Sequence, residues 1–449
     1  MQTRYILRST LAVVLTPLLA VSFIVAMVGA AQAQALSLDA TLTHRALLAG
    51  KKTTTFLKVG VTGALRPKDG PRVPVNVAIV IDKSGSMSGV KIDQARHAAK
   101  MAVGRLAPSD IVSVVGYDST VRVLVPATRV SDKGVIYAGI DQLQARGNTA
   151  LFAGVSKGAE EVRKFADSRY LNRIVLISDG LANVGPSTPA ELTELGRMLA
   201  GEGISVTTLG LGLSYNEDLM AGLARASDGN HAFIEHATSL SHIFDLEFGE
   251  VLNAVARDVE VTVRCAPGVR PVRLLGRTGD IIGDRVVVRL NQLFSRREKF
   301  LMLEVEVDPQ AAGAARALAS VSVVYGDLID QANRTLAAEV GVRWTASAAE
   351  MEASVNRDAM VKAIELVASE KSRLAMSLND QGRRREAEKV LQGNADYLDR
   401  SWKRYKAPSL RKMKRDNIDD AKNLDPARYN KTRKAMKHRQ STLEMQQAL

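Results

Sequence analysis

Three oxygen-bearing side chains stand at alternate positions just after an apolar run. Asp82, Ser84 and Ser86 follow the segment VPVNVAIVI, which has the continuous hydrophobic character of a buried parallel strand. Ligands of doubly wound α/β sheets bind beyond the carboxyl ends of such strands, where the helices diverge. Because the spacing D-x-S-x-S is a weak signal by itself, a ligand site here needs partners from elsewhere in the chain.

Two later segments supply such partners. Thr149 lies in RGNTALFAG, just before a predicted helix, and Asp179 follows another apolar strand in VLISDGLANVG. Oxygen ligands without thiol or imidazole suit Mg²⁺, which prefers near-octahedral order and keeps some waters, while Mn²⁺ and Ca²⁺ remain alternatives. The sequence therefore predicts a divalent-cation site formed by Asp82, Ser84, Ser86, Thr149 and Asp179.

These segments also carry a family resemblance. DKSGSMSG, GNTAL and LISDG resemble the metal-ion-dependent adhesion site (MIDAS) of von Willebrand factor type A domains, and all five positions match. The resemblance spans about residues 73–251 and implies a Rossmann-like fold. It implies that Ser84 and Ser86 bind the metal directly and that the other three residues bind directly or through water. In this family an acidic side chain of a protein partner often fills one metal position.

Other interpretations of these motifs give different functions. The opening loop could be a relic that binds nothing, or an anion-binding loop of backbone amides. GSMSG has Met87 at the nucleophile position of a hydrolase elbow, and GLGLSY lacks the third glycine of a dinucleotide loop. His231, His236 and His242 share no helical or strand spacing, which favours surface or packing roles. No catalytic residue is expected, since a metallohydrolase needs a general base and both carboxylates are committed as ligands.

Hydrophobic patterns divide the 449 residues into domains. Residues 73–252 alternate apolar strands with helical segments, which indicates a doubly wound, mostly parallel sheet covered on both faces. Residues 253–346 show strands of period-two alternation, typical of an antiparallel β-sandwich, which the strand within residues 36–72 is expected to join. Residues 347–449 form a basic helical region whose first two helices are expected to dock on the sandwich. Its last thirty or so residues are expected to be only partly ordered.

The first 35 residues have the features of a secretory signal. Arg4 and Arg8 precede a long apolar run, and the small residues of AQAQA allow cleavage after Ala33 or Ala35. The alternative is an uncleaved anchor, because about 20 apolar residues span a bilayer. Both interpretations predict an exported protein of the periplasm or cell envelope. Cys265, the only cysteine, excludes an intramolecular disulfide and is expected to be a small buried hydrophobe rather than a reactive thiol.

The net charge of +13 bears on the class of partner. The basic excess is densest in SLRKMKRDNIDDAKNLDPARYNKTRKAMKHRQ, and an exported protein meets anionic lipids and wall polymers rather than nucleic acid. A solvated helical surface is the simpler explanation of the same charge. The first functional hypothesis is a non-catalytic adhesion module that captures a Glu or Asp carboxylate of a protein partner. The alternative is an envelope assembly or scaffold factor whose basic tail binds membrane or wall polymer.

Overall fold

The structure is a computed structural model that describes residues 34–66, 72–167 and 169–446. Of the signal segment predicted for residues 1–35, residues 1–33 lie outside the described residues. Cleavage of this signal therefore stays a prediction. Among the residues that the structure describes, no helix has both the length and the apolar character needed to cross a membrane.

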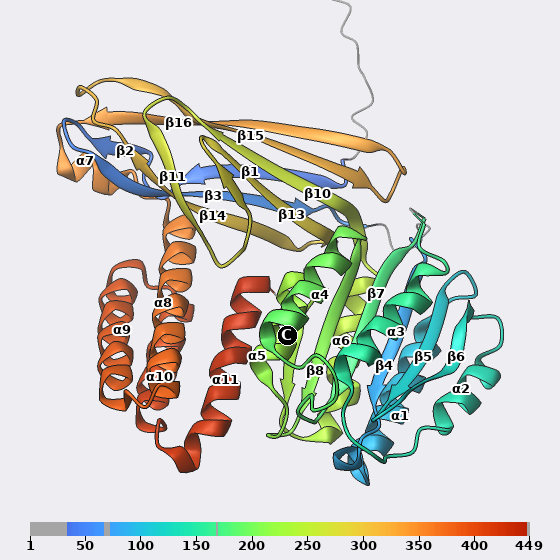
Figure 1. The fold of residues 1–449 in the computed structure, drawn as a ribbon. Helices are drawn as coiled ribbons and strands as arrows, with labels where there is room; N and C mark the ends of the chain where they lie inside the picture. Colours follow the sequence, from blue (N-terminus) through green and yellow to red (C-terminus); the bar gives the residue numbers. More distant parts are fainter. Residues whose placement is uncertain (1–33, 67–71, 168, 447–449) are drawn as a thin grey trace, which may run out of the picture. The chain divides into compact units, whose positions relative to one another are not determined.

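A six-stranded sheet carries the alternation of strands and helices (Figure 1). Its strand order is β6-β5-β4-β7-β8-β9, and every neighbouring pair is parallel except β5 with β6. The predicted doubly wound, mostly parallel sheet is confirmed. Its strands are β4 (Val75–Asp82), β5 (Ile111–Tyr117), β6 (Val121–Arg129), β7 (Leu171–Ser178), β8 (Ile204–Leu211) and β9 (His231–Ile234).

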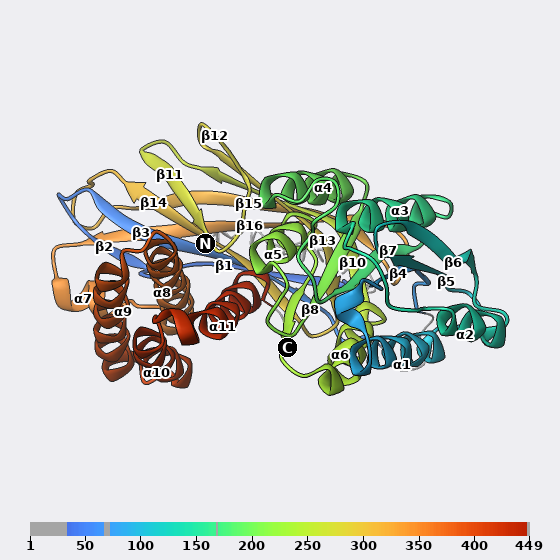
Figure 2. The same cartoon turned by 60° about the horizontal axis from the view of Figure 1, so that its bottom comes forward.

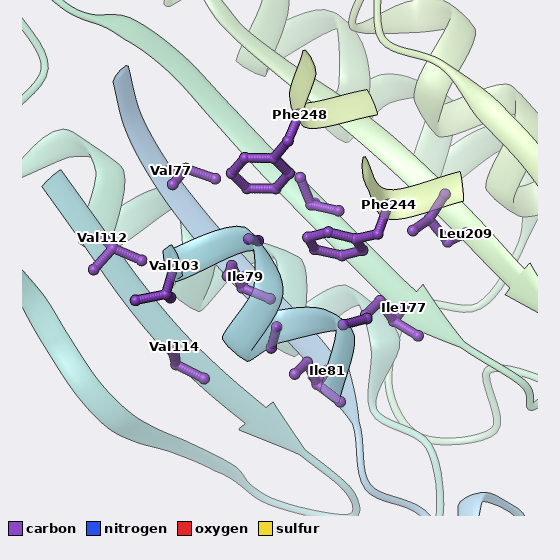
Figure 3. Close-up of a cluster of buried hydrophobic side chains, with 14 of the residues drawn as sticks. Val77, Ile79, Ile81, Val103, Val112, Val114, Ile177, Leu209, Phe244 and Phe248 are labelled. Atoms are coloured by element: carbon purple, nitrogen blue, oxygen red, sulfur yellow. The ribbon is translucent and has the colours of Figure 1, made fainter. Parts of the chain in front are cut away.

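Helices cover both faces of this sheet because its strands are apolar on both sides. Along β4, Val77 and Ile79 belong to one buried cluster, and Ala78 and Val80 to another. Figure 3 shows the first cluster, with Phe244 of α6 among the strand residues. The first face is covered by α1 (Val90–Arg105), α2 (Lys133–Asp141) and α6 (Leu240–Val251), and the second by α3 (Leu151–Arg163), α4 (Pro189–Gly201) and α5 (Glu217–Ala226).

Two further sheets enclose a second core and confirm the predicted β-sandwich. Their orders are β1-β3-β14-β11 and β12-β13-β10-β15-β16-β2, with all pairs antiparallel except β16 with β2. Val261 and Val263 of β10 point into this core, as their alternation predicts. The strands are β1 (Leu36–Leu42), β2 (Ala46–Leu48), β3 (Thr53–Gly63), β10 (Ala254–Cys265), β11 (Val269–Leu275), β12 (Asp280–Ile282), β13 (Arg285–Phe294), β14 (Glu298–Val307), β15 (Ala315–Asp327) and β16 (Asn333–Thr345).

Strand β3 pairs with a strand that lies beyond the whole α/β region in the chain. Thr53 pairs with Val307, and Thr62 pairs with Glu298 of β14. The segment before the parallel sheet is therefore part of the sandwich core. Cys265 at the end of β10 is buried, and burial raises the pKa of its thiol to about 11, which keeps it protonated.

Five helices follow the sandwich. The prediction that the first two long helices dock on the sandwich is confirmed for the first of them, because Ala363 and Leu366 of α8 pack against Phe300 and Met302 of β14. The second, α9, packs mainly against α8 and α10 instead. The helices are α7 (Ala348–Ala353), α8 (Arg357–Asp380), α9 (Arg384–Tyr405), α10 (Pro408–Lys422) and α11 (Pro426–Met445).

For the described part of the tail, which ends at residue 446, the expectation of only partial order is wrong. Helix α11 packs against α8 on one side and against α5 and β9 on the other (Figures 1 and 2). Lys434 is buried and donates to Glu217 at 2.5 Å, and Arg433 donates to Asp218 at 2.5 Å and to Asp380 at 2.8 Å. Several of the basic residues that suggested a solvated tail, Arg433 and Lys434 among them, are thus partners of acidic residues within the same chain.

Candidate metal centre

Strand register brings the predicted ligands to one edge of the parallel sheet. β4 and β7 are neighbours, with Ile81 paired to Ile177, so Asp82 and Asp179 leave the sheet side by side. Ser84 and Ser86 lie in the turn after β4, which includes the short 3₁₀ helix η1 (Gly85–Met87). Parallel strands end at a common edge, and this is the reason that residues so far apart in sequence meet.

Hydrogen bonds join these oxygen atoms directly. Ser86 Oγ donates to Asp179 Oδ1 at 2.7 Å, and the hydroxyl oxygens of Ser84 and Ser86 are 3.0 Å apart. The backbone N–H of Ser84 donates to Asp82 Oδ1 at 2.8 Å, which closes the turn after the strand. Four of the five predicted residues therefore form one continuous network.

Thr149 reaches the same place from the loop before α3. A methyl group placed on Gly180 would lie 2.9 Å from Thr149 Oγ1, 3.5 Å from Ser86 Oγ and 3.6 Å from Asp82 Oδ2. Oxygen atoms of the turn after β4 and of the threonine loop therefore border one small space beside Gly180, which lies in the loop after β7. The backbone N–H of Thr149 donates to Asn183 Oδ1 at 2.8 Å, which fixes the threonine loop to the loop after β7.

The two carboxylates, Asp82 and Asp179, are fully buried. A buried charge without a compensating partner is energetically unfavourable. Burial raises the pKa of Asp82, and the neighbouring Asp179 adds to this rise, while hydrogen bonds from Ser178 and Ser84 oppose it. A divalent cation between the carboxylates would compensate both charges. The donor set of two carboxylates and three hydroxyls therefore fits a hard cation such as Mg²⁺.

Within the described ranges, no three His, Cys, Asp or Glu side chains are grouped closely enough to hold a metal by themselves. A cation at this edge would therefore depend on the serine and threonine hydroxyls as well as on the two aspartates.

Two neighbours of the site were not identified from the sequence. Ser178 Oγ donates to Asp82 Oδ2 at 2.7 Å, and the Lys91 ammonium contacts Asp179 Oδ2 and lies 3.3 Å from the carbonyl oxygen of Ser86. The sequence could have indicated Ser178, because it precedes Asp179 at the end of an apolar strand. No sequence pattern indicated Lys91, because its approach to Asp179 depends on the direction in which α1 leaves the turn after β4.

Supporting contacts hold the loops in place from behind. Lys83 forms a buried ion pair with Asp118, and the backbone N–H of Gly85 donates to the carbonyl of Gly147 at 3.0 Å. The backbone N–H of Ala150 donates to the Asp118 carbonyl at 2.9 Å. The turn after β4 and the threonine loop are therefore joined directly by one backbone hydrogen bond and indirectly through Asp118, which lies between β5 and β6, without using a predicted ligand.

His231, one of the three histidines singled out in the sequence, does not join this cluster. His231 is buried in β9, where its Nδ1 lies 2.8 Å from Thr208 Oγ1. Burial and the nearby cations of α11 lower the pKa of His231 to about 3, so its ring is neutral. This is the packing role that its sequence context favours.

Comparison with known proteins identifies the α/β region. The family model described as von Willebrand factor type A domain matches residues 76–246. Residues 76–246 form a von Willebrand factor type A domain. Members of this family mediate protein–protein interactions and commonly bind a divalent metal through the MIDAS.

Proteins similar to this chain include bacterial ones. An uncharacterized protein of Synechocystis sp. is 27% identical over 303 residues, covering 65% of this chain and 71% of that protein. The uncharacterized protein YfbK of Escherichia coli is 30% identical over 216 residues, covering 47% of this chain and 37% of that protein. The solved von Willebrand factor type A protein of Catenulispora acidiphila is 17% identical with a TM-score of 0.68, covering 88% of this chain and 92% of that chain. This last similarity extends the shared fold to the sandwich and helices.

Proposed function

We propose that this type A protein binds a divalent cation at Asp82, Ser84, Ser86, Thr149 and Asp179 and captures an acidic group of a protein partner there. The observation that carries the proposal is the convergence of these oxygen atoms from three loops onto one sheet edge. Ligand hardness favours Mg²⁺ over softer ions.

The protein's own residues prepare this site in distinct ways. Asp82 and Asp179 supply the negative charge, and the three hydroxyls add neutral oxygen ligands that do not reduce the cation's charge further. When bound, the cation supplies a Lewis-acidic position for a carboxylate oxygen of the partner. Ser178 and the Ser84 backbone hold Asp82 in orientation.

The proposed role is non-catalytic. Hydrolysis would need a general base beside an activated water, and both carboxylates of the cluster are assigned to the cation. Asp118, the next carboxylate behind the loops, is paired with Lys83. Burial opposes its ionisation, but Lys83 and Thr120 outweigh that effect and lower the pKa of Asp118, so it is a poor base.

We also propose that the protein is exported to the periplasm or cell envelope, on the basis of residues 1–35. Mass spectrometry of the protein recovered from an envelope fraction would show an N-terminus at Gln34 or Leu36 if the signal is cleaved. An intact N-terminus in the membrane fraction would support the anchor instead. Recovery only from the cytosol would refute export.

A scaffold role through a polymer-binding tail gains less support from the structure. Lys431 pairs with Glu235, Lys437 with Asp218 and Lys414 with Asp399. Cations held in such pairs are less available for an anionic polymer. We therefore place partner binding at the type A domain.

Calorimetric titration with Mg²⁺ and Mn²⁺ tests the metal site. Wild type should show one saturable event, and Asp82→Ala should show none. Gly180→Ala removes no ligand but crowds Thr149 Oγ1, and it should weaken binding by about tenfold, which corresponds to 1.4 kcal/mol. Asp93→Ala, an exposed change on α1, is the matched control and should bind as wild type does. Equal titrations of wild type and Asp82→Ala would refute the site.

Partner capture is tested separately. Immobilised wild type, incubated with envelope extract, should retain a protein in Mg²⁺ and release it in EDTA, while Asp82→Ala should retain none. The same protein retained in all three conditions would move partner binding away from the metal site, even if the titration had shown metal binding.

A further inference from the structure

The residues just before β1 distinguish between the two cleavage positions of the export signal. The sequence allows cleavage after Ala33 or after Ala35, because both positions complete an A-x-A pattern. Ala35 and Leu36 belong to the hydrophobic core of the sandwich, and both side chains are buried. Gln34, in contrast, is exposed. The packed part of this segment therefore begins at Ala35.

Ala35 also extends the pairing of β1 with β3. Leu36 of β1 is paired with Gly63 of β3. One residue further, the carbonyl of Ala35 accepts from the backbone N–H of Ala64 at 2.8 Å. Such bonds between neighbouring backbones hold antiparallel strands together. Ala35 is therefore bound to the sheet by its backbone as well as by its side chain.

The backbone N–H of Ala35 meets a buried carboxylate. It donates to Asp327 Oδ2 at 3.3 Å, and Asp327 is the last residue of β15. Arg334 Nε lies 3.2 Å from the same oxygen atom, so the charge of Asp327 already has a partner. The backbone N–H of Ile329 donates to the other carboxylate oxygen at 2.8 Å. Ala35 therefore supplies an uncharged donor to a carboxylate whose charge is already balanced.

Cleavage after Ala35 would remove these contacts and create a new buried charge. The chain would begin at Leu36, so its ammonium group would stand at a residue that is 1% exposed. A buried charge is unfavourable unless it is paired, and Asp327 is already paired with Arg334. Cleavage after Ala33 keeps Ala35 and places the new ammonium group on the exposed Gln34, where water solvates it.

We propose that the export signal is cleaved between Ala33 and Gln34 and that Ala35 stays in the sandwich core of the mature protein. Hydrolysis of this peptide bond by the host's signal peptidase leaves a carboxylate on Ala33 and an ammonium group on Gln34. The inference rests on the proposed export. It does not depend on metal binding or on partner capture.

Mass spectrometry of the N-terminal peptide tests the proposal, with the full chain expressed in a Gram-negative bacterium and recovered from the periplasm. The mature chain should begin at Gln34. A chain that begins at Leu36 would overturn the proposal but leave export intact. An uncleaved chain in the membrane fraction would overturn the proposal and support the anchor. An uncleaved chain found only in the cytosol would refute export itself.

Two substitutions distinguish the cleavage positions within the signal. Ala31 completes the A-x-A pattern only for cleavage after Ala33, so Ala31→Phe should remove most of the chain that begins at Gln34. Gln32→Phe places the same side chain between the two small residues of that pattern. It is the matched control and should be processed as wild type is. Equal processing of Ala31→Phe and wild type would overturn the proposal.

Purified chains that begin at Gln34 and at Leu36 test the role of Ala35 directly. The melting temperature of the shorter chain should be lower by about 2 °C or more, because it lacks the contacts of Ala35 and buries an ammonium group. Gln34→Ser in the longer chain is the control and should leave the melting temperature unchanged, since Gln34 is exposed. Equal melting temperatures of the two chains would overturn the place of Ala35 in the mature core.

Discussion

At the residue scale, the proposed metal site lies beside a cation of the protein's own, the ammonium group of Lys91. The Lys91 ammonium contacts Asp179 Oδ2, the same carboxylate that the Ser86 hydroxyl contacts. A divalent ion and an ammonium group compete for one carboxylate oxygen. Lys91, which is not a predicted ligand, is therefore expected to tune how strongly the proposed site holds a cation.

We predict that Lys91→Met tightens Mg²⁺ binding by about threefold to tenfold, because the competing charge is removed while the length of the side chain is kept. Calorimetric titration gives the affinity. Lys100→Met is the matched control, since Lys100 lies on the same helix but pairs with Asp141. Weaker binding in Lys91→Met would show that the ammonium supports the site instead of competing with the metal.

At the element scale, α11 is held to the type A domain by charge as well as by packing. Lys437 Nζ lies 2.7 Å from Asp218 Oδ1, and Arg433 Nη2 lies 2.5 Å from Asp218 Oδ2. Burial opposes ionisation of Asp218, but Lys437 and Arg433 outweigh it and lower the pKa to about 2 from the ordinary 3.8. Asp218 therefore joins α5 to α11 only while it is ionised.

The sign of the pH effect follows from that lowered pKa. The unfolded chain takes up the proton first as pH falls, so the stabilisation by Asp218 is complete above about pH 4 and is lost toward about pH 2. We predict that wild type is more stable than Asp218→Asn at pH 6 and that the difference shrinks across this window. Denaturant unfolding at several pH values measures it, with Asp93→Asn as control. A difference independent of pH would contradict the role of the ionised carboxylate.

At the scale of the whole molecule, one buried aspartate connects three regions. Asp228, just after α5, accepts from Arg277 at 3.2 Å, from the Asn291 backbone at 2.8 Å and from Lys299 at 3.0 Å, all on the sandwich. Arg277 also donates to Gln446 at the end of α11 at 3.3 Å. The position of the type A domain on the sandwich thus depends on a charge cluster as well as on apolar contact.

We predict that Asp228→Asn lowers the free energy of unfolding by about 3 kcal/mol or more, because Arg277 and Lys299 stay buried without their counter-charge. Asparagine tolerates the positive φ of 51° at this position, so the change tests charge rather than backbone strain. Denaturant unfolding followed by far-UV circular dichroism measures it. Asp280→Asn, whose partner Arg289 is exposed, should change stability little. An equal effect of both substitutions would contradict the special role of Asp228.

The local pattern of the sequence was sufficient to predict the sheet of the type A domain and the sheet edge at which the candidate ligands meet. Continuous apolar strands such as β4 indicate a parallel sheet, and parallel strands end at one edge, so the sequence alone places Asp82 and Asp179 together. The strands of the sandwich could also be predicted from the sequence, because each buries one face and its apolar residues therefore alternate with polar ones.

Features that depend on contacts between distant segments could be learned only from the tertiary structure. The pairing of β3 with β14, the approach of Lys91 to Asp179 and the docking of α11 are set by register and packing, which local hydrophobicity does not encode. Composition alone made the tail look like a solvated basic segment, since a lysine such as Lys434 has the same sequence signature whether it faces water or Glu217. Its partner lies more than two hundred residues away in the chain and is brought to it by the fold.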